Sequence, residues 1–461
     1  MESRTRTCTT LLAIAVLVAA CGGSAPAPQS SSPASPPPSL TPPASSPTTS
    51  PPSTTSPPST TSPPPPSGDS AGSATQAEID GLLERIRIQP DDAGAQRDLG
   101  LALLQRIRET ADPSLYGPAS AALTRARALD PSDGLALVGE GGLALGQHRF
   151  ADALATGRRA VAALPGYGPA REVVVDALVE LGRYAEADRE MARLVAGSRD
   201  LPALARLSYL RELHGDLPGA LAAMREAADR PGIAPENTAY VTALLGNLRT
   251  YDQQPAAARR AYESALRLVS DHAPSLAGLG RLAVAEGDLP EAIRRFGQAA
   301  EILPLPEYVI ALGESQAVDG RSVAAERSFA LARAEIRLFQ AAGVTVDLEL
   351  ALFEADHGNT ATALDLARSA FAATPTVRAA DAVAWALHRL GRDTEAAAWS
   401  HRALRLGSID PILRYHAGAI EAGLGRFRDA SRDLATALAT DSGFSPLGRE
   451  DARRLLARLA S

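Results

Sequence analysis

The sequence predicts an all-α fold, an α-solenoid of about ten helix-turn-helix repeats that follows a disordered linker. The main observation is an alanine that returns at intervals of 33 or 34 residues, with two intervals of 38 residues. A period of this length, with two helices per unit, is typical of helical solenoids. Alanine, leucine and arginine dominate the composition, and aromatic residues make up only 4% of the chain. The recurring alanines are Ala119, Ala153, Ala187, Ala220, Ala258, Ala292, Ala325, Ala363, Ala396 and Ala430.

The clearest copy of the repeat is residues 287–304, with the sequence GDLPEAIRRFGQAAEILP. Its first glycine can adopt the left-handed conformation that ends a helix, because glycine has no Cβ to clash. Pro290 follows in the first helical turn, where no backbone hydrogen bond is lost. Ala292, Phe296 and Ala299 then share one helical face, because they are spaced by four and three residues. The segment therefore predicts a helix whose alanines let a neighbouring helix approach closely.

The other copies keep the same frame. A glycine stands five residues before the recurring alanine at Gly182, Gly215, Gly287, Gly320, Gly358, Gly391 and Gly425. A leucine–glycine pair marks the preceding helix at Leu99-Gly100, Leu245-Gly246, Leu279-Gly280 and Leu312-Gly313. Over roughly residues 78–442 these features resemble the tetratricopeptide repeat family. The resemblance implies a right-handed superhelix in which the first helix of each repeat lines a concave groove. It also implies a scaffold rather than an enzyme, without saying what the scaffold holds.

The amino terminus, residues 1–20, predicts a signal peptide. Arg4 and Arg6 precede a short apolar run, Leu11–Ala20, which is too short to span a bilayer as a mature helix. The run ends at Cys21 in a pattern that resembles the bacterial lipobox. The resemblance implies cleavage before Cys21 and a diacylglycerol on its sulfur, and hence a membrane-anchored, exported protein. The alternative is an ordinary signal peptide that is cut at an A-x-A site, with a chance cysteine.

Residues 21–75 predict a disordered tether, because they are almost wholly proline, serine, threonine and alanine and cannot bury a core. At ~3.1 Å per residue, such a segment could lift a domain away from a membrane surface. Only two cysteines occur in the chain. Cys8 would leave with the signal peptide and Cys21 would be acylated. The mature protein is therefore expected to have no disulfide and no thiolate metal site.

The repeat array is predicted over residues 76–442 and a C-terminal capping helix over residues 443–461. The changes in spacing predict three insertions, at Glu109–Pro118, near Pro231–Glu236 and near Phe339–Thr345. Ser445 is a plausible N-cap for the last helix, which we expect to begin at Pro446 and to run to about Leu459. Charged residues are frequent in this helix, as a closing cap requires.

No motif predicts an enzyme, a cofactor or a metal site. The seven histidines lack zincin spacing, and the chain has no G-x-S-x-G motif, no P-loop and no credible dinucleotide fingerprint. The net charge is −7, lysine is absent, and no basic run is present. Binding of nucleic acid is therefore not expected, because it requires an excess of positive charge along one face.

Candidate binding residues come from the concave positions that the family resemblance assigns. These positions include Glu212, Glu307 and Glu314 and two clusters on the first helices. The first cluster is Tyr209, Tyr240, Asn247, Tyr251 and Arg281. The second is Arg378, Asp381, Trp385, His388 and Arg389, which share one helical face. Asn247 matches the asparagine with which family members grip a peptide, and Arg281 could bind a carboxylate. The alternative for both clusters is a solvated groove wall, with Trp385 partly packed on the next repeat.

The leading functional hypothesis is a membrane-anchored scaffold outside the cytoplasm that binds another envelope protein or an extended peptide. The alternative is a glycan- or peptidoglycan-associated module of the envelope, in which groove tyrosines stack on sugar rings. An enzyme is the third possibility, and the sequence offers no catalytic constellation for it. The two binding hypotheses place the contacts differently, because a glycan would need the tyrosines and a protein partner could use Trp385.

Overall fold

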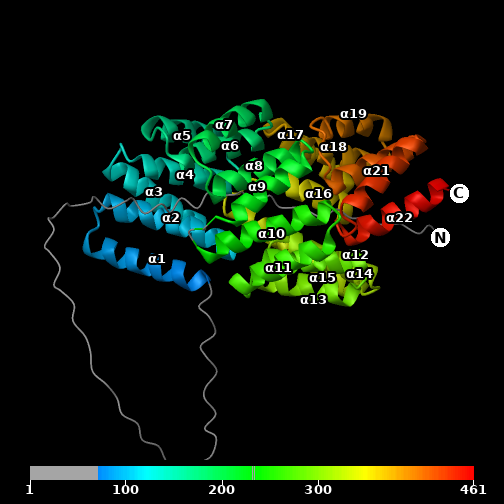
Figure 1. Ribbon diagram of the computed structural model, residues 1–461, viewed down its shortest axis with the longest axis horizontal. Helices are drawn as coiled ribbons and strands as arrows, with labels where there is room; N and C mark the ends of the chain where they lie inside the picture. Colours follow the sequence, from blue (N-terminus) through cyan, green and yellow to red (C-terminus); the bar gives the residue numbers. More distant parts are fainter. Residues whose placement is uncertain (1–70, 231, 233, 461) are drawn as a thin grey trace, which may run out of the picture. The chain divides into compact units, whose positions relative to one another are not determined.

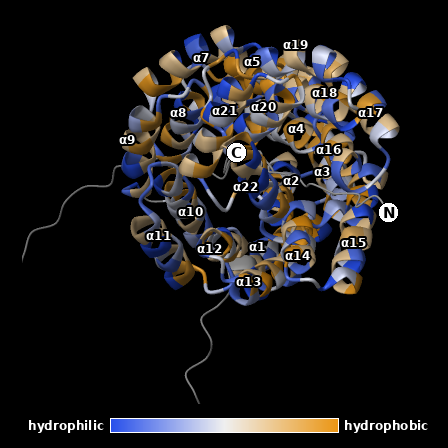
Figure 2. Cartoon of the chain, turned by 90° about the vertical axis from the view of Figure 1, so that its right-hand side faces the viewer, coloured by the Kyte–Doolittle hydropathy of each residue, from blue (hydrophilic) through white to orange (hydrophobic). Residues whose placement is uncertain are grey.

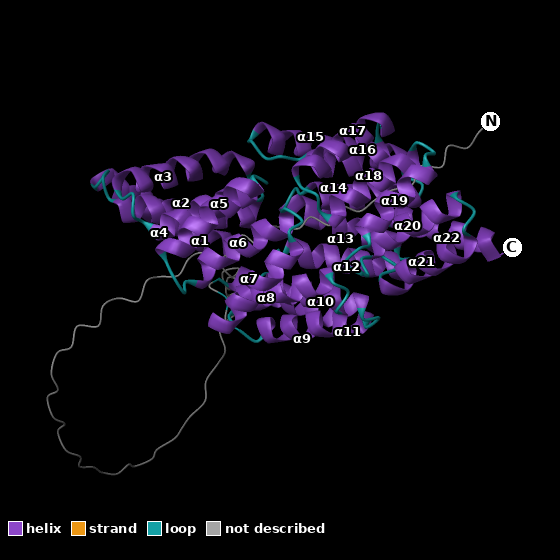
Figure 3. Cartoon of the chain, turned by 90° about the horizontal axis from the view of Figure 1, so that it is seen from above, coloured by secondary structure: helices purple, strands orange, loops and turns teal. Residues whose placement is uncertain are grey.

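The structure is a computed structural model that describes residues 71–230, 232 and 234–460, with side chains from residue 74. The predicted signal peptide, Cys21 and almost all of the tether lie outside the described residues. The described residues belong to one compact unit and form helices without strands (Figure 3). The elements are α1 (Ala71–Ile88), α2 (Ala93–Thr110), the 3₁₀ helix η1 (Pro113–Leu115), α3 (Tyr116–Leu129), α4 (Gly134–Gly146), α5 (Phe150–Ala163), α6 (Gly168–Glu180), α7 (Tyr184–Gly197), α8 (Leu201–Leu213), α9 (Leu217–Ala228), α10 (Pro235–Tyr251), α11 (Pro255–Leu268), α12 (Ala273–Glu286), α13 (Leu289–Ile302), α14 (Pro306–Val318), α15 (Ser322–Ala341), α16 (Asp347–His357), α17 (Thr360–Ala373), α18 (Val377–Arg389), α19 (Asp393–Ala403), α20 (Pro411–Gly423), α21 (Phe427–Thr440) and α22 (Pro446–Ala460).

The predicted solenoid is confirmed. From α2 to α21 the helices pack in consecutive antiparallel pairs, and successive pairs stack on one another (Figure 1). All ten recurring alanines are buried, and none is more than 3% exposed. The array begins earlier than predicted, because α1 starts at Ala71 rather than near residue 76. The alanine period therefore gives both the helix pairs and their buried faces.

One repeat, α12 with α13, shows how the local sequence makes this packing. Gly287 ends α12 with a φ of +82°, a conformation that a side chain would strain. Asp288 caps α13 by accepting a hydrogen bond from the backbone N–H of Glu291 at 3.1 Å. Phe296 is 1% exposed between the two fully buried alanines of its face. The predicted glycine conformation recurs at six of the seven positions. Gly358 is the exception, because its φ is −142° and Asn359 caps the next helix instead.

The superhelix returns to its own earlier repeats. The Nδ1 atom of His148, after α4, lies 2.7 Å from the carbonyl oxygen of Thr345, 197 residues further along the chain. The hydroxyl of Tyr184, on α7, accepts a hydrogen bond at 3.0 Å from the backbone N–H of Val377, 193 residues away. Gly215 lies so close to the later loop that a Cβ there would be 2.4 Å from the carbonyl oxygen of Gly407. We call this row of contacts between turns the seam.

Two of the three predicted insertions meet across the interior, and the third forms part of the seam. Arg108, just before the first insertion, pairs with Glu236 of the second at 2.5 Å. Ala111 of the first insertion packs in an apolar cluster with residues of α12 and α14. The third insertion supplies Thr345, whose backbone N–H donates to the carbonyl oxygen of Gln147 at 3.2 Å. Each of the three departures from the regular period thus lies at a contact with a distant repeat.

The C-terminal helix α22 begins at Pro446, and Ser445 caps it by accepting from the backbone N–H of Gly448 at 2.9 Å, as predicted. Its role differs from that of a simple closing cap. The hydroxyl of Ser445 also donates to Glu314 on α14 at 3.0 Å, 131 residues away. Arg449 donates to the carbonyl oxygen of Ala285 at the end of α12 at 3.4 Å. The helix therefore links the last repeat to repeats in the middle of the array, and in the view of Figure 2 it lies in front of the middle of the ring of helices.

Candidate functional site

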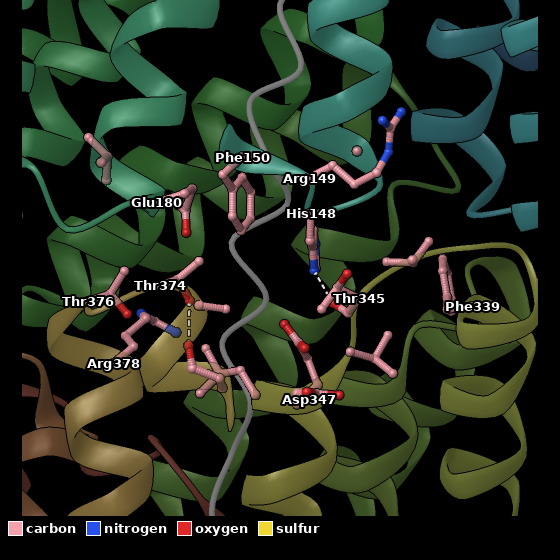
Figure 4. Close-up of a pocket in the computed structure, with 18 of the residues that line it drawn as sticks. His148, Arg149, Phe150, Glu180, Phe339, Thr345, Asp347, Thr374, Thr376 and Arg378 are labelled. Atoms are coloured by element: carbon pink, nitrogen blue, oxygen red, sulfur yellow. Dashed lines mark hydrogen bonds between the residues drawn. The ribbon is translucent and has the colours of Figure 1, made fainter. Parts of the chain in front are cut away.

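The return of the superhelix encloses a cavity of about 540 Å³ between distant repeats (Figure 4). Its wall comes from α2–α8, α14–α18, α20 and the loops of the seam. Ligand pockets in proteins are typically of this size and are usually apolar with a few placed polar groups. This cavity has that character, because most of its wall is apolar. Apolar side chains that face it include Leu104, Phe150, Leu213, Phe339, Leu352 and Ile412.

Several charged groups of the wall neutralise one another within the protein. Arg149 pairs with Asp152 at 2.8 Å, and Arg378 lies 3.5 Å from Asp410. The carboxylate of Asp381 lies 2.8 Å from Nδ1 of the buried His416. These groups shape the wall without needing a ligand to balance their charge.

Three carboxylates of the wall stand apart from these pairs: Glu180 at the end of α6, Glu307 on α14 and Glu349 on α16. Within the described residues none of the three forms an ion pair or a hydrogen bond with another side chain. Burial raises the pKa of Glu180 to about 7, although His148 and Arg378 oppose the rise. Burial raises the pKa of Glu307 to about 8, and the neighbouring Glu349 adds to the rise. Atom Oε2 of Glu349 is itself fully buried without a hydrogen-bond partner.

The first predicted cluster does not form one site. Tyr209 lines the cavity, whereas Asn247, Tyr251 and Arg281 surround a separate space of about 10 Å³ beneath the turn between α21 and α22. Tyr240 is half-buried and lines neither space. Tyr209 and Tyr251, two of the groove tyrosines of the glycan hypothesis, therefore line different spaces.

Asn247 was predicted to grip a peptide, and the structure gives its side chain another role. Its carboxamide oxygen accepts hydrogen bonds from the hydroxyl of Tyr262 at 2.8 Å and from Arg281 at 2.5 Å. Burial raises the pKa of Asp441 to about 6, and the positive charge of the nearby Arg281 opposes this rise. Arg281 is therefore engaged by the protein itself. In this conformation both side chains are bonded within the protein, and their binding of a ligand stays a prediction.

In the second predicted cluster, Arg378 and Asp381 line the cavity, and Trp385 does not. Trp385 has no exposed surface, its ring stacks on His416 at 3.9 Å, and its Nε1–H donates to Asp356 at 2.8 Å. The prediction of Trp385 as a groove residue is therefore wrong, and it is a core residue.

The other two members of this cluster serve the surrounding packing. His388 lies 2.5 Å from Asp393, and the guanidinium of Arg389 donates to the carbonyl oxygen of Ala355 at 3.1 Å. Neither residue lines the cavity.

Glu180, Glu349 and Phe150 line the cavity, and sequence reasoning did not select them. Glu307 was among the predicted concave positions, and Phe339 marked one of the predicted insertions. Glu180 and Phe150 flank turns rather than lying mid-helix, and the seam brings those turns inside. A charged residue beside a turn is ordinarily solvated, so the sequence carried no signal for these positions. Glu314, also predicted as concave, is fully buried and accepts the hydrogen bond from Ser445.

In the part of the chain that the structure describes, no group of three or more histidine, cysteine, aspartate or glutamate side chains could hold a metal ion. From residue 71 onward, no described helix is both long and apolar enough to cross a membrane. The cavity therefore offers apolar walls and separate, unpaired carboxylates.

Residues 115–168 and 244–305 match the family model of the tetratricopeptide repeat. Both matched segments lie within the array, whose consecutive helix pairs are typical of a tetratricopeptide-repeat solenoid. Solved structures of low similarity include the tetratricopeptide domain of P58(IPK), which is 14% identical over 84% of this chain and 96% of that chain, with a TM-score of 0.27. A human IFIT1 dimer with PPP-AAAA is 14% identical over 72% of this chain and 78% of that chain, with a TM-score of 0.45. A tetratricopeptide repeat protein from Parabacteroides merdae is 16% identical over 57% of this chain and 99% of that chain, with a TM-score of 0.34. These similarities carry no argument about the ligand of this solenoid, and no curated protein sequence matches the chain.

Proposed function

We propose that the protein is a membrane-anchored scaffold outside the cytoplasm, and that its solenoid binds a segment of another envelope protein in the enclosed cavity. The observation that carries the proposal is the cavity of about 540 Å³ inside a tetratricopeptide-repeat array. Solenoids of this type generally hold peptides or proteins, and a stacked array presents its side chains at fixed positions. Little entropy is then lost by the receptor when the partner binds.

The anchoring part of the proposal rests on the sequence alone. Arg4 and Arg6, the short apolar run and Cys21 favour export and lipid attachment, and the proline-rich tether would give the solenoid reach above the membrane. If Cys21 is acylated, the chain should incorporate labelled palmitate in a bacterial host, and Cys21→Ser should abolish the labelling. Labelling that survives Cys21→Ser would contradict the lipid anchor and leave the cavity proposal unaffected.

The binding part of the proposal is tested by photocrosslinking from inside the cavity. A benzophenone amino acid replaces Phe339, which lines the cavity, in the full chain expressed in its native envelope. We expect a discrete adduct with another protein after irradiation, because a bound segment would lie against this side chain.

The matched control places the same benzophenone at Phe427, which is 58% exposed and lies outside the cavity. An adduct obtained from Phe339 and not from Phe427 would support binding in the cavity. Adducts from Phe427 alone would contradict the proposal and would indicate that partners bind the outer surface. A crosslink from Phe339 to wall glycan would favour the glycan-associated module instead.

A further inference from the structure

We propose that the cavity selects a cationic ligand: a short extended peptide segment in which arginine or lysine side chains alternate with apolar ones. The inference deepens the proposed function and rests on it, because it states which chemistry the cavity recognises. Two observations support the inference: the apolar wall of the cavity and the unpaired carboxylates of Glu180, Glu307 and Glu349.

The first step is the charge balance of the wall. The arginines of the wall already have acidic neighbours: Arg149 has Asp152, Arg378 has Asp410, and Arg108 has Glu236 outside the cavity. The only histidine of the wall, His148, is bonded to the carbonyl oxygen of Thr345. After these pairings the wall keeps the three carboxyls of Glu180, Glu307 and Glu349 without an opposite charge, and an anionic ligand would meet repulsion from them once they ionise.

The second step is the cost of leaving these carboxylates buried. A buried ionised group without a partner is unfavourable, and it shifts its pKa or recruits an opposite charge. Glu180 and Glu307 show that shift, since burial raises the pKa of both carboxyls. The Oε2 atom of Glu349 is buried without a hydrogen-bond donor, although the carboxylate faces the cavity. A cation that enters the cavity would supply the missing donor.

The third step is the spacing of the charges. All three acids line the same cavity, and the charge of Glu349 is one of the causes that raise the pKa values of Glu180 and Glu307. Within residues 71–230, 232 and 234–460, however, no such group could close around a single metal ion. The arrangement therefore fits a ligand with separate positive charges better than one small ion.

The fourth step is the wall between the charges. Phe150, Leu213 and Phe339 are among the apolar side chains that line the same space as the carboxylates. A polyamine without apolar groups would leave this surface uncovered, whereas a peptide that alternates basic and apolar side chains would bury it. Arginine and lysine side chains also carry apolar stems that suit such a wall.

The test measures binding of a fluorescein-labelled peptide of alternating leucine and arginine to the full chain by fluorescence anisotropy. Two matched peptides carry glutamine or glutamate in place of arginine. We expect saturable binding of the arginine peptide, at least about tenfold weaker binding of the glutamine peptide and no binding of the glutamate peptide. Equal affinities for the arginine and glutamine peptides would overturn the inference.

The protein variants locate the recognised charge. Glu180→Gln with Glu307→Gln should weaken binding of the arginine peptide at least about tenfold. Glu263→Gln with Glu301→Gln removes the same charge from exposed positions on α11 and α13 and should leave the affinity unchanged. Equal losses in both double variants would show attraction to the net negative charge of the chain and would overturn the inference.

Failure of the inference is distinguishable from failure of the proposed function. If the glutamate peptide binds and a crosslink still forms from the position of Phe339, the scaffold stands and its ligand is not cationic. If no peptide binds and no crosslink forms at Phe339, both proposals fail.

Discussion

Glu180 and Arg389 occupy the same position of the repeat, seven residues before the recurring alanines Ala187 and Ala396, yet their surroundings differ. Arg389 lies over the ring of Trp385, at 5.8 Å from its centroid, and donates to a backbone carbonyl oxygen. Glu180 faces the cavity without an ion pair among the described residues. A repeat position therefore fixes the place of a side chain on its helix. The coiling of the superhelix decides whether that side chain has a bonding partner.

The difference separates groups that hold the structure together from groups that are available to a ligand. Around Trp385, the indole N–H reaches Asp356, and His416 reaches Asp381, so polar atoms are matched inside the protein. Around Glu180, the basic side chains are engaged elsewhere: His148 is bonded to the carbonyl oxygen of Thr345, and Arg378 lies 3.5 Å from Asp410. The predictions below use this contrast, and they run from the largest expected effect to the smallest.

Removal of the indole should cause the largest loss of stability. Trp385→Ala would leave a cavity in the core and would deprive Asp356 of its donor, so we expect a loss of about 3–5 kcal/mol in the free energy of unfolding. Urea denaturation followed by circular dichroism measures it. Phe427→Ala, at a side chain that is 58% exposed, is the control and should change the stability little. A loss below about 1 kcal/mol for Trp385→Ala would contradict its assignment to the core.

Removal of the unpaired carboxylates should instead increase the stability of the protein. Glu180→Gln with Glu307→Gln should raise the free energy of unfolding by about 1–2 kcal/mol at pH 9, because the native state no longer buries two unpaired charges. The effect should vanish below about pH 4, where these carboxyls are protonated in both the native and the unfolded state.

The pH dependence follows from the sign of the pKa shifts. The native pKa values of Glu180 and Glu307, about 7 and about 8, lie above the ordinary value of 4.5. The native state therefore binds more protons than the unfolded state between these values, and stability falls as the pH rises from 4.5 to about 8. The double glutamine variant should show a flatter profile than the parent chain or the Glu263→Gln/Glu301→Gln control. Identical profiles in all three would show that these carboxyls titrate normally.

Loss of a single hydrogen bond in the seam should lower the stability by a smaller amount. His148→Ala removes the hydrogen bond to the carbonyl oxygen of Thr345, and we expect a loss of about 1 kcal/mol in the free energy of unfolding. His401→Ala is the matched control, because that side chain is 72% exposed, and it should change stability by less than about 0.5 kcal/mol. Hydrogen exchange at Gly343–Val346 should accelerate in His148→Ala alone. Unchanged exchange there would mean that the bond does not hold the loop.

The fold was largely predictable because its signals are local. Ala292, Phe296 and Ala299 reveal their buried face within one helix, and Gly287 reveals the turn before it. The insertions were also visible, since they interrupt a regular count. A repeat period cannot predict a contact such as that between His148 and Thr345, because these residues lie 197 positions apart.

The candidate site was predictable only in part for the same reason. Arg378 and Tyr209 were selected as concave residues and do line the cavity. Trp385 was selected because tryptophan is common at binding hot spots, and its neighbours bury it instead. Glu180 was missed because a glutamate beside a turn is ordinarily solvated. Its exposure changes only when the later turn of the superhelix closes over it.

The seam also fixes how many repeats this protein can have. In an open solenoid each repeat touches only its neighbours, so a unit can be gained or lost with little effect on the rest. Here the turn before Tyr184 must meet the loop before Val377, and the turn at Gly215 must meet the loop at Gly407. The two turns of the superhelix are therefore held in one register. Loss of one repeat between them would shift every later repeat relative to its contact across the seam, so the repeat number is part of the structure itself.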